Sequence, residues 1–140
     1  SEGSLKEALI DADIFIGVSA ANLVSEEMVQ KMNKDAIIFA MANPNPEILP
    51  DLAKKAGAKV VGTGRSDFPN QINNVLAFPG IFKGALKIKK QISDKMKIAA
   101  AVALANFIKE EDLSENYIIP KPFETGIAEK IAEAIEKESE

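Results

Sequence analysis

Ala36-Ile-Ile-Phe-Ala-Met-Ala42 is a short apolar run, and similar runs precede it at Asp13-Ile-Phe-Ile-Gly-Val18 and follow it at Lys59-Val-Val-Gly62. None of the three alternates apolar with polar residues, so each is predicted to be a strand buried on both faces. They begin at residues 13, 36 and 59, a constant interval of 23 residues. That interval is typical of strand–helix–strand units and predicts a parallel sheet with crossover helices.

Helix signals lie before and between these strands. Ser4-Leu-Lys-Glu7 is a capping box that opens a first helix, and Ser25 suits the N-cap of a second helix over residues 25–33. Pro50 suits the first position of a third helix, over residues 50–56. The order of these elements predicts an α/β fold.

Three further helices are predicted in the second half, over residues 81–92, 94–109 and 126–138, with Thr125 as the cap of the last. The segment 98–107 is apolar nearly all round, so its helix is predicted to be buried on more than one side. The sheet, another domain or another subunit could each cover it, and the sequence leaves that choice open.

Composition narrows the function classes. The 140 residues carry a net charge of −4, which disfavours nonspecific electrostatic binding to nucleic acid or to an anionic membrane. Without cysteine or histidine, the sequence excludes disulfides, thiolate zinc sites and a histidine base. The longest apolar stretch, residues 98–105, is far shorter than the roughly 20 residues that span a bilayer. A cytoplasmic location is therefore expected, with neither nucleic acid nor membrane as a partner.

Small polar residues, glycine and proline gather where each predicted strand ends. The three exits read Gly17-Val-Ser-Ala-Ala-Asn22, Asn43-Pro-Asn-Pro-Glu47 and Thr63-Gly-Arg-Ser-Asp67. Ligands of open parallel sheets bind beyond such carboxyl ends, although turn residues also belong wherever a strand ends. Asn43 precedes a proline and has two equally supported interpretations. It either starts a turn, or its side chain reaches a cofactor's sugar or amide. Arg65 either pairs with Asp67 or meets an anion.

A helix over residues 69–78, with Pro69 at its first position, would place Asn70, Asn73 and Asn74 on one face. Asparagine is a poor helix former, and local rules broken in this way gather at functional sites. A side-chain amide both donates and accepts, which suits a ligand that carries hydroxyl, carboxylate and amide groups. The alternative is that these amides tie the following loop to the sheet.

Several familiar site motifs are missing. No Gly-x-Gly-x-x-Gly follows any predicted strand, and no carboxylate cluster has convincing metal-ligand spacing. The lone tyrosine, Tyr117, has no obvious base beside it. Gly64, Gly80 and Gly84 are interpreted as positions where another backbone comes close. No catalytic residue and no metal ligand is therefore predicted within this chain.

Seven motifs together resemble malic enzymes of the small prokaryotic type. They are Gly17-Val-Ser19, Phe39-Ala-Met-Ala-Asn-Pro44, Pro46-Glu-Ile48, Gly64-Arg-Ser-Asp-Phe-Pro-Asn-Gln-Ile-Asn-Asn74, Phe78-Pro-Gly80, Ile81-Phe-Lys-Gly-Ala-Leu86 and Tyr117-Ile-Ile-Pro120. The resemblance covers nearly the whole chain, and the run over residues 64–80 is highly specific. It implies the second half of a Rossmann-like doubly wound parallel sheet, with about three strands, followed by C-terminal helices.

The resemblance also implies an activity. Such enzymes oxidise malate with NAD or NADP, then decarboxylate the bound oxaloacetate to pyruvate and CO2 with Mg or Mn, and a homodimer is implied. Ser19 and Ala20 would lie along the cofactor, with Asn43 near the nicotinamide ribose and the substrate. Asn73 and Asn74 would contact malate, and Asn74 also the nicotinamide end of the cofactor.

In that family, segments upstream of this sequence carry the catalytic tyrosine and lysine and the metal-binding carboxylates. They also carry the glycine-rich phosphate loop and the residue that separates NAD from NADP. Tyr117 does not replace that tyrosine. Residues 1–140 are therefore expected to be the C-terminal part of the NAD(P)-binding domain of a longer chain, with its N-terminal part as partner, and to be inactive alone. A non-catalytic half-Rossmann binding or assembly module remains an alternative. A glutamate-dehydrogenase relative fits the fold but not the run over residues 64–80.

Overall fold

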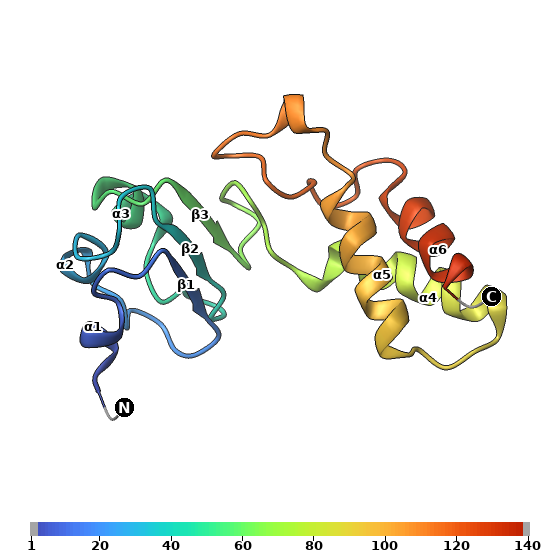
Figure 1. Cartoon of the computed structure of the whole chain (residues 1–140), viewed down its shortest axis with the longest axis horizontal. Coiled ribbons are helices and arrows are strands. Elements are labelled where there is room, and N and C mark those ends of the chain that lie inside the picture. The colour runs from blue at the N-terminus through green and yellow to red at the C-terminus, as the bar shows by residue number, and fades with distance from the viewer. Residues whose placement is uncertain (1–2, 139–140) are drawn as a thin grey trace. The chain divides into compact units, whose positions relative to one another are not determined.

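The computed structural model describes residues 3–138, and the chain divides into two compact units, the first ending at Ile72 and the second beginning at Asn73. Each unit has its own hydrophobic core. The first unit holds the sheet, and the second is built from helices and two short 3-10 turns (Figure 1).

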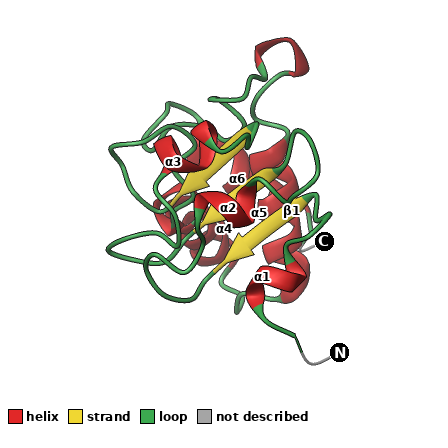
Figure 2. Cartoon of the chain, turned by 90° about the vertical axis from the view of Figure 1, so that its left-hand side faces the viewer, coloured by secondary structure: helices red, strands yellow, loops and turns green. Residues whose placement is uncertain are grey.

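The first unit is built on three parallel strands, and this sheet confirms the prediction from the 23-residue interval. The strands are β1 (Ile14–Gly17), β2 (Ile37–Ala40) and β3 (Val60–Thr63). Their order is β1-β2-β3, and Ile37 lies opposite both Ile14 and Val60 in the register. Figure 2 shows the three arrows side by side and pointing the same way. Their carboxyl ends therefore share one edge of the sheet.

Three short helices accompany the sheet. They are α1 (Leu5–Ala8), α2 (Glu26–Val29) and α3 (Pro50–Lys55), and Figures 1 and 2 show them on one face of the strands. The predicted capping box is present, because Ser4 Oγ accepts from the Glu7 N–H and the Glu7 carboxylate accepts from the Ser4 N–H. Ser25 caps α2 and Pro50 begins α3, as predicted. Both of these helices are shorter than predicted.

The two faces of the sheet differ in burial. Phe15, Ile38 and Val61 point into the core beneath the helices. On the opposite face of β1, Ile14 and Ile16 are 52% and 63% exposed. The prediction that every strand is buried on both faces is therefore wrong for β1. The side chains of β1 are apolar on both faces of the sheet, which led to the prediction. The helices of this unit, however, pack on only one of those faces.

The second unit consists mainly of three helices that pack on one another. They are α4 (Phe78–Ile88), α5 (Asp94–Ala105) and α6 (Ile127–Lys137). The 3-10 turn η1 (Asn74–Leu76) precedes α4, and the 3-10 turn η2 (Glu110–Asp112) lies between α5 and α6. A Cβ atom on Gly80 would lie 2.6 Å from Ile131 Cβ, and one on Gly84 would lie 3.0 Å from Ile135 Cβ. The expected close approach is confirmed at both glycines. At Gly64 a Cβ would meet only ordinary contacts, at 3.7 Å and beyond.

Three helix predictions for the part of the chain after β3 are wrong. Residues 69–78 do not form a helix, because Asn70 adopts a left-handed backbone conformation with φ of 54° and only η1 lies within that range. Thr125 is not the cap of α6, since the N-cap residue is Gly126 with φ of 94°. α4 begins earlier than predicted, at Phe78, and ends at Ile88.

The apolar helix of the second unit is also less buried than predicted. α5 turns Met96, Ala100 and Ala103 into the core. Ile98 and Val102, on another side of the helix, are 65% and 53% exposed. Burial on more than one side is therefore not observed in this chain, because the helix packs mainly against α6.

Candidate functional site

The carboxyl edge of the sheet is organised around Glu47, a carboxylate with 0% exposure. Its Oε1 accepts hydrogen bonds from the Ser19 N–H, with N···O 2.8 Å, and from the Ser19 hydroxyl, with O···O 3.1 Å. Its Oε2 accepts from the Ala42 N–H at 3.0 Å. Ser19 follows β1 and Ala42 follows β2, so one side chain joins two strand exits.

Backbone hydrogen bonds reinforce this junction. The Asn22 N–H donates to the Pro46 carbonyl at 3.1 Å, and the Val24 N–H donates to the Glu47 carbonyl at 3.0 Å. Gly17 leaves the space that the carboxylate fills, because a Cβ there would lie 2.6 Å from Glu47 Oε1. The two exit loops are thus held at fixed separation by the main chain and by a buried side chain together.

The hydrogen bonds around Glu47 favour its charged form. Burial raises the pKa of Glu47, but the N–H groups of Ser19, Ala42 and Glu47 itself, with the Ser19 hydroxyl, outweigh burial and hold the pKa below its ordinary value. Sequence reasoning missed this residue as part of the site. Its only signal was an acidic residue between Pro46 and the apolar Ile48, which does not reveal burial.

Three of the predicted site residues lie beside this junction. Ser19, Ala20 and Asn43 are all exposed, and Asn43 directly follows Ala42 and precedes a cis peptide bond to Pro44. One carboxylate therefore holds Ser19 itself and Ala42, the residue directly before Asn43. The exposed groups of Ser19 and Asn43 are a hydroxyl and an amide, without formal charge.

Hydrogen bonds after β3 decide between the two interpretations given for Arg65 and between the two given for Asn70. The Arg65 guanidinium donates to both carboxylate oxygens of Asp67, at 2.8 and 2.6 Å, and stacks over the Phe68 ring. This hydrogen-bonded pair lowers the pKa of Asp67. Asn70 is buried and donates from its side chain to the Val61 carbonyl at 3.0 Å. Asn70 therefore ties its loop to the sheet, as the alternative interpretation held.

Asn73 and Asn74 belong to the second unit. The Asn73 side chain accepts from the Val75 N–H at 3.1 Å and caps η1, whose first residue is Asn74. Both asparagines are exposed. The predicted single helix face of three amides is wrong, because Asn70 is buried and no helix joins it to the other two.

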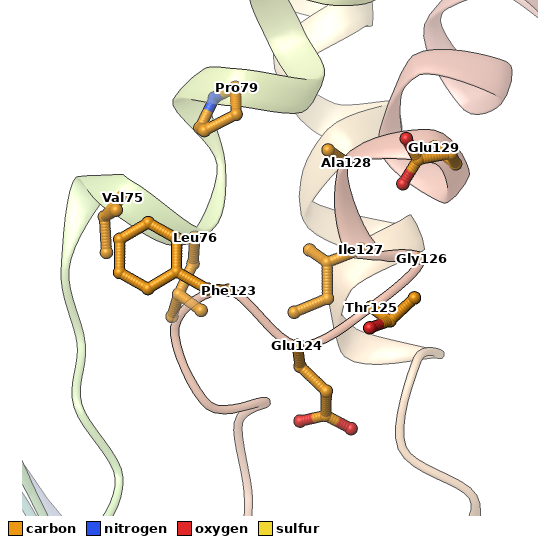
Figure 3. Close-up of a pocket in the computed structure, with 10 residues that line it drawn as sticks. All are labelled: Val75, Leu76, Pro79, Phe123, Glu124, Thr125, Gly126, Ile127, Ala128 and Glu129. Atoms are coloured by element: carbon orange, nitrogen blue, oxygen red, sulfur yellow. The ribbon is translucent and has the colours of Figure 1, made fainter.

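A pocket of about 280 Å³ lies within the second unit (Figure 3). Its apolar lining comes from η1, from the loop before α6 and from the start of α6, as the labelled side chains of Val75, Leu76, Phe123 and Ile127 show. Glu124 also lines it and accepts from the Tyr117 hydroxyl at 3.0 Å. Tyr117 thus has a carboxylate beside it, contrary to expectation, and burial with this hydrogen bond raises the pKa of Tyr117.

The described residues offer neither a metal site nor a membrane-spanning helix. Among residues 3–138, no group of three or more aspartate, glutamate, histidine or cysteine side chains is arranged to hold a metal ion. No helix in the described part of the chain has the length and apolar character that crossing a bilayer requires.

Comparison with known proteins gives consistent results. The family model described as "Malic enzyme, NAD binding domain" matches residues 4–139. The bifunctional malic/malolactic enzyme of Bacillus subtilis is 60% identical over 97% of this chain and 33% of its own length. The NAD-dependent malic enzyme of Geobacillus stearothermophilus is 51% identical over 96% of this chain and 28% of its own length. The NADP-dependent malic enzyme of Rhizobium meliloti is 47% identical over 96% of this chain and 20% of its own length.

A solved structure shows the same arrangement of elements. The crystal structure of malic enzyme from Pyrococcus horikoshii superimposes with a TM-score of 0.90 at 49% identity, covering 98% of this chain and 32% of that one. This likeness confirms the predicted Rossmann-like half-sheet followed by helices. The chain spans about a third or less of the length of the relatives it matches.

Proposed function

Since this chain belongs to the malic enzyme family, through its NAD-binding domain, we propose that it is one segment of an oxidoreductase that converts malate to pyruvate and CO2 with NAD or NADP. In this proposal residues 1–140 are the C-terminal part of the NAD(P)-binding domain of a longer chain. The segment supplies contacts to cofactor and substrate and is inactive alone.

The observation that supports this role is the edge of the sheet held by Glu47. Ligands of doubly wound sheets bind beyond the carboxyl ends of the strands, where Ser19, Ala20 and Asn43 are exposed. The ribose and carboxamide of a dinucleotide are neutral groups that donate and accept hydrogen bonds, which matches a hydroxyl and an amide. The small side chain of Ala20 leaves room for a close approach. The residues present therefore fit the cofactor.

Each residue has a defined task in this proposal. When bound, NAD(P) would supply the hydride acceptor, and Mg or Mn would supply a Lewis acid whose ligands lie outside this segment. Ser19 and Ala20 hold the cofactor, and Asn43 orients its nicotinamide ribose against the substrate. Asn73 and Asn74 bind malate through their amides, with Asn74 also at the nicotinamide end. A homodimeric assembly and a cytoplasmic location stay predictions.

The amide of Asn74 provides the test of this function. In the full-length enzyme, Asn74→Ala should lower kcat/KM for malate by about 10- to 150-fold, because a hydrogen bond to a charged group contributes about 1.5–3 kcal/mol. Asn33→Ala is the matched control, since Asn33 bonds to Asp11 and Asp13 away from the carboxyl edge. Malate turnover would be measured with saturating NAD or NADP. Unchanged kinetics in Asn74→Ala would contradict the assignment.

A second candidate function is a non-catalytic half-Rossmann assembly module. The exposed apolar side chains of Ile16 on β1 and Phe82 on α4 favour it, because such surfaces usually contact another protein surface. Calorimetric titration of the full-length protein with NAD and with NADP separates the two candidates. The enzyme binds at least one nucleotide, whereas the assembly module binds neither.

A further inference from the structure

The groups that surround the Glu47 carboxylate all donate hydrogen bonds. They are the backbone N–H groups of Ser19, Ala42 and Glu47 itself, and the hydroxyl of Ser19. An ionised carboxylate can only accept, so the hydrogen of the Ser19 hydroxyl must point at Glu47 Oε1. Since Glu47 is fully buried and Gly17 leaves no spare space beside it, this arrangement is fixed by packing as well as by hydrogen bonds.

The chemistry of the Ser19 hydroxyl follows from this. A hydroxyl carries one hydrogen and two lone pairs, and at Ser19 the hydrogen is already used. Ser19 is exposed, so its remaining lone pairs are available to a ligand at the edge of the sheet. Its partner must then be a donor, such as a ribose hydroxyl or a carboxamide N–H. A carboxylate or an unprotonated phosphate oxygen, which only accepts, cannot be that partner.

We propose that Glu47 is a positioning residue that fixes Ser19 Oγ as a hydrogen-bond acceptor for a donor group of the nicotinamide cofactor. This inference rests on the proposed function and deepens it. It assigns Ser19 to the ribose or carboxamide part of the dinucleotide and not to the pyrophosphate or to the carboxylates of malate. Glu47 itself touches neither cofactor nor substrate.

Glutamine at position 47 would disturb this arrangement of donors. The amide of Glu47→Gln keeps the size of the side chain but replaces one acceptor oxygen by an N–H₂ group. Oε1 also accepts from the Ser19 N–H, and Oε2 accepts from the Ala42 N–H, so this N–H₂ group would oppose a backbone donor at either position and loosen the hold on the Ser19 hydroxyl. Cofactor affinity should fall about tenfold, the effect of a change near 1.4 kcal/mol. The same loss is expected for Ser19→Ala, which removes the acceptor.

The test is a double-mutant cycle in the full-length enzyme, with the Kd of NAD and NADP measured by calorimetry for the wild type, both single variants and the double variant. Glu47→Gln should weaken binding about tenfold alone but change it less than about twofold when Ser19 is alanine. Glu7→Gln is the control, because Glu7 accepts from the N–H and hydroxyl of Ser4 in the same way within α1. Its Kd should equal that of the wild type.

Several results would overturn the inference. If Glu47→Gln weakens cofactor binding equally with serine and with alanine at position 19, Glu47 does not act through the Ser19 hydroxyl. Unchanged cofactor affinity in either single variant would also contradict the inference. If Glu47→Gln does not fold, as judged by circular dichroism, Ser19→Thr replaces it, and Thr must retain the affinity that Ala loses. Failure of the proposed function is seen separately, because the wild-type enzyme would then bind neither nucleotide.

Discussion

The Glu47 carboxylate makes the stability of the first unit depend on pH. Its hydrogen bonds hold the folded-state pKa below the ordinary value of 4.5, so the folded protein binds its proton less readily than the unfolded chain. The contribution of Glu47 is therefore complete above about pH 4.5 and is lost as pH falls toward the lower, folded-state pKa. The free energy of unfolding should decrease over this acid range.

Urea unfolding at several pH values from 7 down to about 3 checks this prediction, with the wild type compared against Glu47→Gln. Other carboxylates, including Glu7, also have a lowered pKa, so the difference between the two proteins isolates Glu47. The wild type should lose more stability on acidification than the variant. Parallel pH profiles would show that this carboxylate is not the source.

Single side chains near the site were predictable only where local sequence determines their position. Ser19 and Asn43 follow parallel strands directly, so the strand pattern alone places them at one edge. Glu47 and Asn70 were not predictable, because their burial depends on contacts with the loop after β1 and with β3. A buried carboxylate and a buried amide look like turn residues until those partners are known.

At the scale of elements, the contact between α4 and α6 depends on the small size of Gly80. A Cβ there would lie 2.6 Å from Ile131 Cβ and 3.0 Å from the Ala128 carbonyl oxygen. Gly80→Ala should therefore lower the free energy of unfolding by about 1–3 kcal/mol, the usual cost of overpacking. Lys83→Ala on the same helix removes only an exposed ion pair to Glu129 and should cost less than about 1 kcal/mol. Chemical denaturation measures both, and equal effects would refute the packing argument.

The same scale shows why some elements were predicted well and others were not. Strand positions and the caps at Ser4 and Ser25 follow from signals within a few residues. The segment 69–78 carries helix-compatible spacing, but Asn70 is pulled into the sheet by a hydrogen bond to Val61 and turns left-handed. A tertiary contact thus overrides the local pattern. Gly126, with its positive φ, is the N-cap of α6, where Thr125 was the predicted cap.

At the scale of the whole molecule, the chain carries more apolar surface than its own elements cover. Both faces of β1 are apolar, yet the helices of the first unit cover one. In the second unit, Leu86 on α4 and Ile98 on α5 are 74% and 65% exposed. Such surface is expected where a segment packs against other parts of a larger protein. This agrees with the finding that the chain covers only a third or less of the length of each relative it matches.

The 140-residue chain on its own should therefore self-associate as its concentration rises, because water-exposed apolar surface is buried by association. Sedimentation velocity at increasing protein concentration measures this as a rising weight-average mass. The double variant Leu86→Lys and Ile98→Lys should reduce the effect, since each charge resists transfer out of water. Gln91→Lys is the matched control, because it adds the same charge at an exposed polar position between α4 and α5. A wild-type chain that stays monomeric throughout would show that these side chains do not drive association.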